Sequence, residues 1–142
     1  MTKNYSWNDK VVLVVEDDTS SLMLIKTILS KTGAKILVAE DGETAIDLVQ
    51  NDVSIDLILM DIRLKGLNGL EATKQIKQIK PNTPVIAQTA CAIIGDMEKC
   101  LDAGCNAYIT KPIERNLLLE TMDYYFKMSI AQGMFDNVMY SN

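Results

Sequence analysis

Five short apolar segments recur along the chain and predict a set of β-strands. They cover residues 11–15, 35–39, 56–60, 84–88 and 107–110. The segments are rich in Val, Ile and Leu, and several of them do not alternate with polar residues. A continuous apolar run of this length is typical of a strand covered on both faces, as in a parallel sheet.

The segments between these strands place apolar residues three or four positions apart, which is the spacing of the buried face of a helix. The predicted stripes are Leu22, Ile25, Ile28 and Leu29; Ala45, Leu48 and Val49; Leu70, Thr73 and Ile76; Ile94, Met97 and Leu101; and Leu118, Met122 and Tyr125. Alternation of strands and helices indicates βα units with right-handed crossovers. The pattern therefore predicts an α/β fold in three layers, with a five-stranded parallel sheet.

The composition fits one globular domain. The chain has 142 residues, of which 48% are apolar and 23% are charged, and a domain of this size can bury a core of its own. Nineteen acidic residues against fourteen basic residues give a net charge of −5. Because a nucleic-acid-binding module needs a basic surface to face phosphates, we expect no nucleic-acid partner.

The chain contains no histidine, which restricts its chemistry. A Ser-His-Asp triad and histidine-ligated zinc are excluded. Cys91, Cys100 and Cys105 form no CxxC pair, which favours reduced thiols over a disulfide framework or a zinc site. The polar first ten residues and the lack of an apolar stretch of about 18–20 residues predict a cytoplasmic protein without a membrane span.

Polar residues follow the predicted strands at the points where ligands bind in parallel sheets. In such folds the site lies beyond the carboxyl ends of the strands, where the strand order reverses. The residues placed there are Glu16, Asp17 and Asp18 after the first strand, Asp61 after the third, Thr89 and Ala90 after the fourth, and Lys111 after the fifth. We therefore expect these residues to meet at one edge of the sheet.

The charges at this edge predict a metal ion and a phosphoryl group. Two carboxylates about 4 Å apart repel by about 4 kcal/mol at an effective dielectric constant of about 20, so Glu16, Asp17 and Asp61 need a cation. Magnesium suits a site with a few carboxylates, and Lys111 adds a second positive charge. Each residue alone has an ordinary interpretation, since Asp18 or Thr19 is expected to cap a helix. The coincidence of all of them points to phosphoryl chemistry.

These residues also carry a resemblance to a known family. The segments VVLVVEDD, AEDGETAIDLV, DLILMDIRLKGLNGLEATKQIK, PVIAQTA and CLDAGCNAYITKPI resemble the receiver domain of two-component response regulators, over about residues 10–128. The resemblance implies a flavodoxin-like, doubly wound sheet with strand order 2-1-3-4-5. The stretch TACAIIGDMEKCLDAG is similar to receivers attached to hybrid histidine kinases. A single-domain regulator and a domain of such a kinase both remain open.

The resemblance implies a phosphoacceptor and a metal site. Asp61 corresponds to the aspartate that accepts the phosphoryl group. Glu16 and Asp17 correspond to the acidic pair that holds Mg²⁺, to which Arg63 offers its backbone carbonyl. The donor is expected to be a phosphohistidine on a histidine kinase or a phosphotransfer protein, since this chain has no histidine. A receiver of this kind is not a conventional turnover enzyme.

The resemblance also implies residues that bind the phosphoryl group and a residue that responds to its presence. Thr89 resembles the hydroxyl that contacts it, Ala90 would offer its backbone N–H, and Lys111 resembles the lysine that pairs with it. Tyr108 resembles the aromatic switch residue, and the peptide bond from Lys111 to Pro112 resembles one that is often cis. In one departure, Leu64 and Lys65 stand where many relatives have Met-Pro, which removes no functional group.

Three other functions compete with this interpretation. A haloacid-dehalogenase-type phosphatase needs a second Asp two residues after its nucleophile, where Arg63 stands and cannot release a proton near neutral pH. An FMN binder needs a phosphate-cradling loop after the first strand, where Glu16, Asp17 and Asp18 would repel the phosphate. A non-phosphorylated interaction module of the same fold remains an alternative.

The end of the chain is expected to differ from the rest. Residues 1–128 form the expected receiver domain, and residues 129–142 form a tail or an extension of the last helix. Ile130, Met134 and Val138 lie four positions apart, which fits a helical stripe, although Gly133 weakens it. Such a stripe would pack against a second copy in a two-fold dimer. A frayed end is the other interpretation.

Overall fold

The structure, a computed structural model, describes residues 3–51, 54–64, 66–90 and 94–140, and leaves out the side chains of Ile94 and of residues 129–140. Strands and helices alternate along the whole chain. In order they are β1 (Val11–Val15), α1 (Thr19–Ser30), β2 (Lys35–Ala39), α2 (Gly42–Asn51), β3 (Leu57–Asp61), α3 (Gly69–Ile79), β4 (Val85–Thr89), α4 (Ile94–Ala103), β5 (Ala107–Thr110) and α5 (Arg115–Tyr140).

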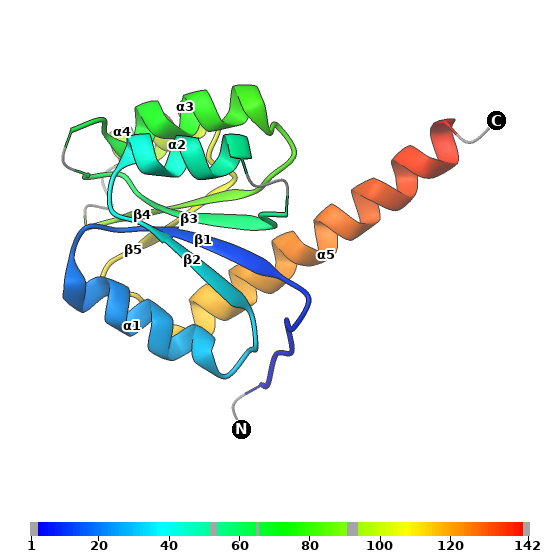
Figure 1. Ribbon diagram of the computed structural model, residues 1–142, viewed down its shortest axis with the longest axis horizontal. Helices are drawn as coiled ribbons and strands as arrows, with labels where there is room; N and C mark the ends of the chain where they lie inside the picture. Colours follow the sequence, from blue (N-terminus) through cyan, green and yellow to red (C-terminus); the bar gives the residue numbers. More distant parts are fainter. Residues whose placement is uncertain (1–2, 52–53, 65, 91–93, 141–142) are drawn as a thin grey trace.

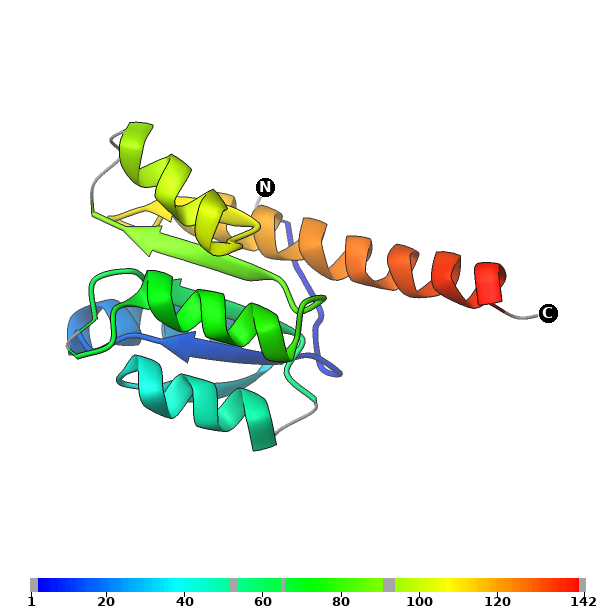
Figure 2. The ribbon, with the colours of Figure 1, turned by 90° about the horizontal axis from the view of Figure 1, so that it is seen from above.

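The five strands form one parallel sheet in the order β2-β1-β3-β4-β5. Helices α2, α3 and α4 cover one face of the sheet, and α1 and α5 cover the other (Figures 1 and 2). The predicted α/β fold, its three layers and its strand order are confirmed. The strand order reverses between β1 and β3, so the carboxyl ends of these two strands border the crevice where such folds bind ligands.

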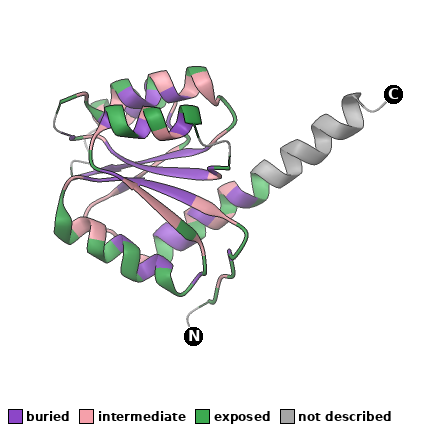
Figure 3. Ribbon diagram, viewed as in Figure 1, coloured by how far each residue is buried: buried purple, intermediate pink, exposed green. Residues whose placement is uncertain are grey.

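The strands are apolar on both faces because each face has its own core. In β1, Leu13 and Val15 belong to the core under α2, α3 and α4, whereas Val12 and Val14 belong to the core under α1 and α5. The inner strands β1, β3 and β4 are correspondingly buried along most of their length, whereas the edge strands β2 and β5 are mostly half-buried. The helices are buried on their inner sides (Figure 3). The continuous apolar runs in the sequence are therefore the direct consequence of burial from two sides.

Two strands are shifted by one residue from the prediction. Strand β3 covers Leu57–Asp61 rather than residues 56–60, and β4 covers Val85–Thr89 rather than residues 84–88. Asp61 is in register with Gln88 of β4, and Thr89 is in register with Thr110 of β5. Both residues are therefore held by the sheet ladder itself, which places their side chains more rigidly than a loop would.

The predicted stripe of α4 is wrong at Leu101. Its side chain is 58% exposed, and the buried residues among the described side chains of this helix are Cys100 and Ala103. The side chain of Ile94, also in the predicted stripe, lies outside the described part. Met97 is half-buried. The neighbouring positions have similar apolar character in the sequence, so only packing against α3 and β5 decides which of them faces inward. Stripes predicted for α1, α2, α3 and α5 lie buried or half-buried against the two cores.

Helix α5 is the longest element and runs from Arg115 to Tyr140. Its first half packs against the segment before β1, where the buried ring of Trp7 lies edge-on to Phe126 with ring centroids 4.9 Å apart. The second half projects away from the body of the domain (Figures 1 and 2). Among the described residues, no helix combines the length and apolar character that crossing a membrane requires.

Candidate functional site

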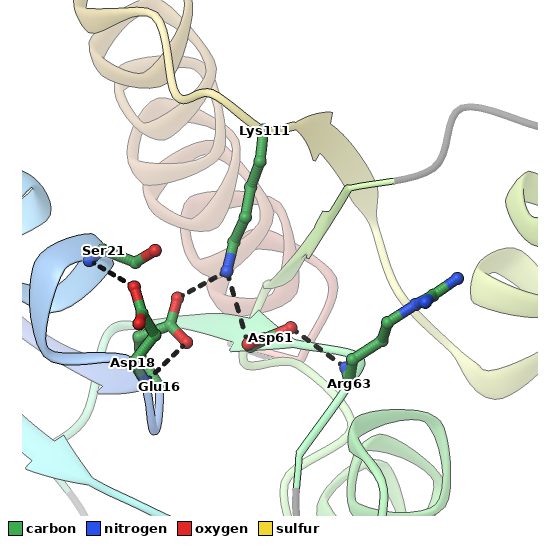
Figure 4. Close-up of polar contacts among 6 residues, drawn as sticks. All are labelled: Glu16, Asp18, Ser21, Asp61, Arg63 and Lys111. Carbon is green, nitrogen blue, oxygen red and sulfur yellow. Dashed lines mark hydrogen bonds and ion pairs between the residues drawn. The ribbon is translucent and has the colours of Figure 1, made fainter.

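The candidate site lies at the carboxyl edge of the sheet. Glu16 directly follows β1, Asp61 is the last residue of β3, and Lys111 directly follows β5. Because the strands are parallel, these positions from distant parts of the sequence arrive at one edge. Their side chains point toward one another across the ends of the strands (Figure 4).

Three carboxylates form a compact group at this edge. One carboxylate oxygen from each of Glu16, Asp17 and Asp61 lies within 4.8 Å of the others. Glu16 and Asp61 are only 1% and 5% exposed. Oxygen ligands at this spacing match the preference of a hard divalent cation such as Mg²⁺, which would offset their mutual repulsion. The residues predicted to meet around a metal are therefore brought together.

Lys111 supplies positive charge to the same group. Its Nζ lies 2.8 Å from Oε1 of Glu16 and 3.4 Å from Oδ2 of Asp61. Burial pulls the pKa of Lys111 down, but the hydrogen bond to Glu16 and the negative charges of Asp61 and Glu16 outweigh burial and raise the pKa above its ordinary value. Lys111 therefore remains a full cation at the pH of any cell.

The acidity of Glu16 is strongly perturbed by its surroundings. Burial is the largest cause and the neighbouring Asp61 carboxylate adds to it, whereas Lys111 acts in the opposite direction; together they raise the pKa of Glu16 to about 7. The site without a metal thus holds more negative charge than one lysine can neutralise. This excess charge is what a divalent cation would relieve.

Backbone N–H groups orient the carboxylates. Oδ1 of Asp61 accepts a hydrogen bond from the backbone N–H of Arg63 at 3.0 Å, so Oδ2 is the oxygen that faces Lys111. Oε2 of Glu16 accepts from the N–H of Asp18 at 3.3 Å. Asp18 itself caps α1 by accepting from the N–H of Ser21 at 2.9 Å (Figure 4). The predicted helix cap is therefore Asp18.

The other predicted residues surround this group. Thr89 is buried at the end of β4, where its carbonyl accepts a hydrogen bond from the N–H of Lys111 at 2.7 Å. Ala90, the next residue, is exposed. Tyr108 is half-buried in β5, and its hydroxyl donates to the sulfur of Met97 in α4 at 3.0 Å. Tyr108 therefore links the site edge to α4 rather than contacting the carboxylates.

Gly69 is a site residue that sequence reasoning missed. A Cβ at this position would overlap the carbonyl oxygen of Asp61 and would lie 2.6 Å from Cα of Ile62. Gly69 thus lets the start of α3 approach the backbone of Asp61. The sequence offered only a glycine between two periodic segments, and many loop glycines have no such contact.

The peptide bond between Lys111 and Pro112 is cis. Among the other predicted features of the site, Leu64 is buried, while Lys65 lies outside the described residues. Cys100 and Cys105 are buried free thiols, and Cys91 also lies outside the described residues.

Comparison with known proteins defines the class to which this fold and site belong. The family model of the response regulator receiver domain matches residues 12–123. The chain belongs to this family and is a receiver domain of two-component signalling. Receiver domains work together with histidine kinases or phosphotransfer proteins.

Two curated relatives illustrate the range of the family. The chain is 45% identical over 120 residues to hybrid signal transduction histidine kinase I of Dictyostelium discoideum, covering 79% of this chain and 7% of that protein. It is 39% identical over 118 residues to the polar-differentiation response regulator DivK of Brucella ovis, covering 82% of this chain and 95% of that protein. The chain thus resembles both a small part of a large kinase and nearly the whole of a regulator.

Two solved structures are similar in fold and sequence. The receiver domain of sensor histidine kinase PA1611 from Pseudomonas aeruginosa, which has a magnesium ion coordinated in its active-site cleft, is 34% identical with a TM-score of 0.77 and covers 83% of this chain and 98% of that chain. The second is the co-crystal structure of the Saccharomyces cerevisiae histidine phosphotransfer protein Ypd1 with the receiver domain of its response regulator Ssk1. A chain of this structure is 28% identical with a TM-score of 0.80, and the match covers 89% of this chain and 93% of that chain.

Proposed function

We propose that this receiver accepts a phosphoryl group on Asp61 from a phosphohistidine of a histidine kinase or phosphotransfer protein. The observation that carries the proposal is the position of Asp61 at the end of β3. One of its carboxylate oxygens is held by a backbone N–H, and the other faces the Lys111 ammonium beside two further carboxylates. This is the arrangement of an oriented carboxylate nucleophile.

The transfer exchanges one bond to phosphorus for another. A carboxylate oxygen of Asp61 attacks the phosphorus, an acyl phosphate forms, and the phosphorus–nitrogen bond breaks with its electron pair returning to the donor imidazole. Hydrolysis of the acyl phosphate by water later restores the carboxylate. The domain takes part in its own modification and is returned to its starting state, so we do not class it as a conventional turnover enzyme.

The carboxylates fit a magnesium ion. Glu16, Asp17 and Asp61, with the backbone carbonyl of Arg63, would hold Mg²⁺, and the similar receiver of PA1611 contains this ion in its cleft. Bound there, Mg²⁺ supplies charge neutralisation for the transferred group. Lys111 would balance part of the added phosphoryl charge, since its Nζ already lies 3.4 Å from Oδ2 of Asp61.

In this proposal the phosphoryl group is bound by Thr89 and Ala90, and Tyr108 responds to its presence. The Thr89 hydroxyl and the Ala90 N–H would hydrogen-bond its oxygens. Tyr108 lies three residues before Lys111 in the sequence and contacts Met97 of α4. A change at Thr89 would therefore be transmitted through the β4–β5 edge to the surface of α4, which is where we place the switched contact surface.

The phosphoryl donor is proposed to dock over an apolar hollow beside Lys111. This hollow has a volume of about 180 Å³ and is lined by Ser20, Ser21, Leu24, Lys111, Pro112 and Ile113. Leu24 is 42% exposed on α1 although it is apolar. A donor protein seated here would bring a histidine ring close to the carboxylates. We place this function in the cytoplasm and expect no nucleic-acid partner, in line with the net charge of −5.

The test of the acceptor is incubation with Mg²⁺ and acetyl phosphate, followed by intact-mass measurement. We expect the wild-type chain to gain the mass of one phosphoryl group and Asp61→Asn to gain none, because the substitution keeps the shape but removes the nucleophile. Asp47→Asn, which changes an exposed carboxylate of α2, is the matched control and should behave as the wild type. Phosphorylation of Asp61→Asn at the wild-type rate would refute the assignment, and a wild-type chain that gains no mass would favour the non-phosphorylated interaction module.

The test of the docking site uses a protein donor. With phosphorylated Ypd1 as the probe, Leu24→Asp should slow the transfer about tenfold or more, because the substitution puts a charge where the docked donor would cover an apolar side chain. The same variant should react normally with acetyl phosphate. Met23→Asp changes a neighbouring exposed residue that does not line the hollow, and it is the control. Equal slowing of phosphoryl transfer by Leu24→Asp and Met23→Asp would contradict docking of the donor over this hollow.

A further inference from the structure

Helix α5 is apolar on two faces. One face, formed by Leu118, Leu119, Met122 and Phe126, is buried in the core against the sheet and α1. The other face carries Leu117, Tyr124 and Met128, which are 49%, 57% and 48% exposed. These three account for half of the six large apolar side chains that are exposed in the described part of the chain. Packing in the core therefore does not explain why the second face is apolar.

The exposed face follows a seven-residue repeat. Spacings of four and three alternate through Leu117, Thr121, Tyr124, Met128, Ala131, Phe135 and Val138. This is the spacing of the a and d positions of a coiled coil, in which apolar residues recur on average every 3.5 residues. The first three positions lie on the first half of α5, and the repeat continues without a break along the projecting half, which is helical to Tyr140.

The repeat contains no charged residue. Its one polar member, Thr121, donates its hydroxyl to the carbonyl of Leu117 at 2.7 Å, so that the hydrogen-bonding group is satisfied within the helix. Residues 129–142 contain no Lys or Arg and a single acid, Asp136, which is outside the repeat. Nothing on this face therefore opposes its removal from water.

The projecting half of α5 also needs a partner for its own stability. A helix of 26 residues is about 39 Å long, and among its described side chains, which end at Met128, the last one in the core is Phe126. Helical turns without tertiary packing are marginal in water. In Figure 2 this half leaves the domain at the end of the sheet opposite to the tips of the strands that carry Asp61 and Lys111, so pairing along it would leave the phosphoacceptor site open.

We propose that α5 pairs with α5 of a second copy of this chain in a parallel, in-register, two-stranded coiled coil along Leu117–Val138. A parallel pair in register covers the whole repeat, whereas in an antiparallel pair centred on the projecting half Leu117 would lie beyond the end of the partner's repeat. Two strands are favoured because Leu118 and Leu119 are committed to the core, which leaves the narrow stripe that a two-stranded coil uses.

The parallel arrangement is compatible with the residues that flank the repeat. In a parallel pair the neighbours across the seam are Glu120 with Tyr125, Lys127 with Gln132, and Met134 with Met139. None of these pairs places like charges together, and the last pair extends the apolar contact. The interaction surface thus recognises a second copy of the same helix through shape and apolar area rather than through charge.

Sedimentation velocity and equilibrium on the full chain test the proposal. We expect a wild-type mass that rises with concentration to about twice the 15.8 kDa of one chain. Phe135→Lys puts a charge in the seam on the projecting half of α5, and it should weaken the dimer at least about tenfold. Asn137→Lys adds the same charge off the seam and should leave the dimer unchanged. Both variants should still accept a phosphoryl group from acetyl phosphate, which separates this test from that of Asp61.

The direction of pairing is tested by disulfide formation. With Val138→Cys, a glutathione redox buffer should join the two copies through the new thiols, because in-register parallel helices bring this position close to its equivalent. Asn137→Cys is the matched control and should cross-link much less. A wild-type chain that stays monomeric, a trimer, a Phe135→Lys variant with unchanged mass, or equal cross-linking of the two cysteine variants would each overturn the proposal.

Discussion

Lys111 lies closer to Glu16 than to the proposed phosphoacceptor: its Nζ is 2.8 Å from Oε1 of Glu16, compared with 3.4 Å from Oδ2 of Asp61. The lysine is therefore held at the site by a carboxylate that would not itself be phosphorylated. Glu16 positions the cation, and Asp61 remains within its reach. A phosphoryl group on Asp61 would bring a stronger anion to the side of Lys111 that is less tightly paired.

Replacement of Lys111 should affect phosphorylation far more than folding. We expect Lys111→Ala to fold with an unchanged far-UV circular dichroism spectrum, because Lys111 contributes charge rather than core volume. Its rate of phosphoryl gain from acetyl phosphate should fall by about 10²-fold, the usual loss when one group that stabilises transition-state charge is removed. Magnesium affinity should rise, since a competing cation has left the carboxylates. Lys127→Ala removes an exposed ion-paired lysine and is the control; unfolding of Lys111→Ala alone would make the lysine structural.

Magnesium binding should depend on Asp17. In isothermal titration calorimetry, we expect Asp17→Asn to bind Mg²⁺ about tenfold more weakly, because the affinity of such sites follows the number of anionic ligands. Asp18→Asn is a stringent control, since Asp18 is the next residue but its side chain caps α1, and an Asn side chain can still accept the Ser21 N–H. Excess chelator should stop phosphorylation of the wild type. Equal affinities in the two variants, or full activity in chelator, would argue against the proposed ligands.

Gly69 should tolerate no side chain. The extra Cβ of Gly69→Ala would overlap the backbone of Asp61 and Ile62, so either α3 or the end of β3 must move. We expect the free energy of unfolding in urea to fall by about 3 kcal/mol and phosphorylation to slow. At Gly95 of α4 an added Cβ meets nothing within 4 Å, so Gly95→Ala should be unchanged or more stable by up to about 1 kcal/mol. Similar stabilities of the two variants would show that the close approach is unimportant.

The start of α2 should make the stability of the fold depend on pH in the acid range. The Asp41 carboxylate accepts the backbone N–H of Thr44 at 2.7 Å, and this hydrogen bond lowers the pKa of Asp41 below its ordinary value of 3.8. A lowered folded-state pKa stabilises the fold above the unfolded-state pKa, and this contribution is lost as the pH falls through the folded-state value. The urea midpoint of the wild type should therefore exceed that of Asp41→Asn near neutral pH, and the difference should shrink below pH 3.8. A difference that is constant with pH would contradict this role.

The sequence alone determines the strands and the chemistry at their ends. Val11–Val15 reads as a buried strand because its residues face two cores, and in a parallel sheet the residues after such strands can only arrive at one edge. Glu16, Asp61 and Lys111 were therefore predictable as neighbours before any coordinates. The apolar repeat of α5 is also present in the sequence, since its spacing is local to one helix.

Tertiary structure decided what depends on contacts between distant segments. The alignment of Val15 with Met60 sets how closely Glu16 approaches Asp61, and the alignment of Thr89 with Thr110 sets where Lys111 begins. Packing also decided that Cys100 rather than Leu101 is buried, and that Gly69 lies against the backbone of Asp61. Local spacing specifies which face of an element is apolar, but strand register and close approach arise from many long-range contacts whose sum no single segment encodes.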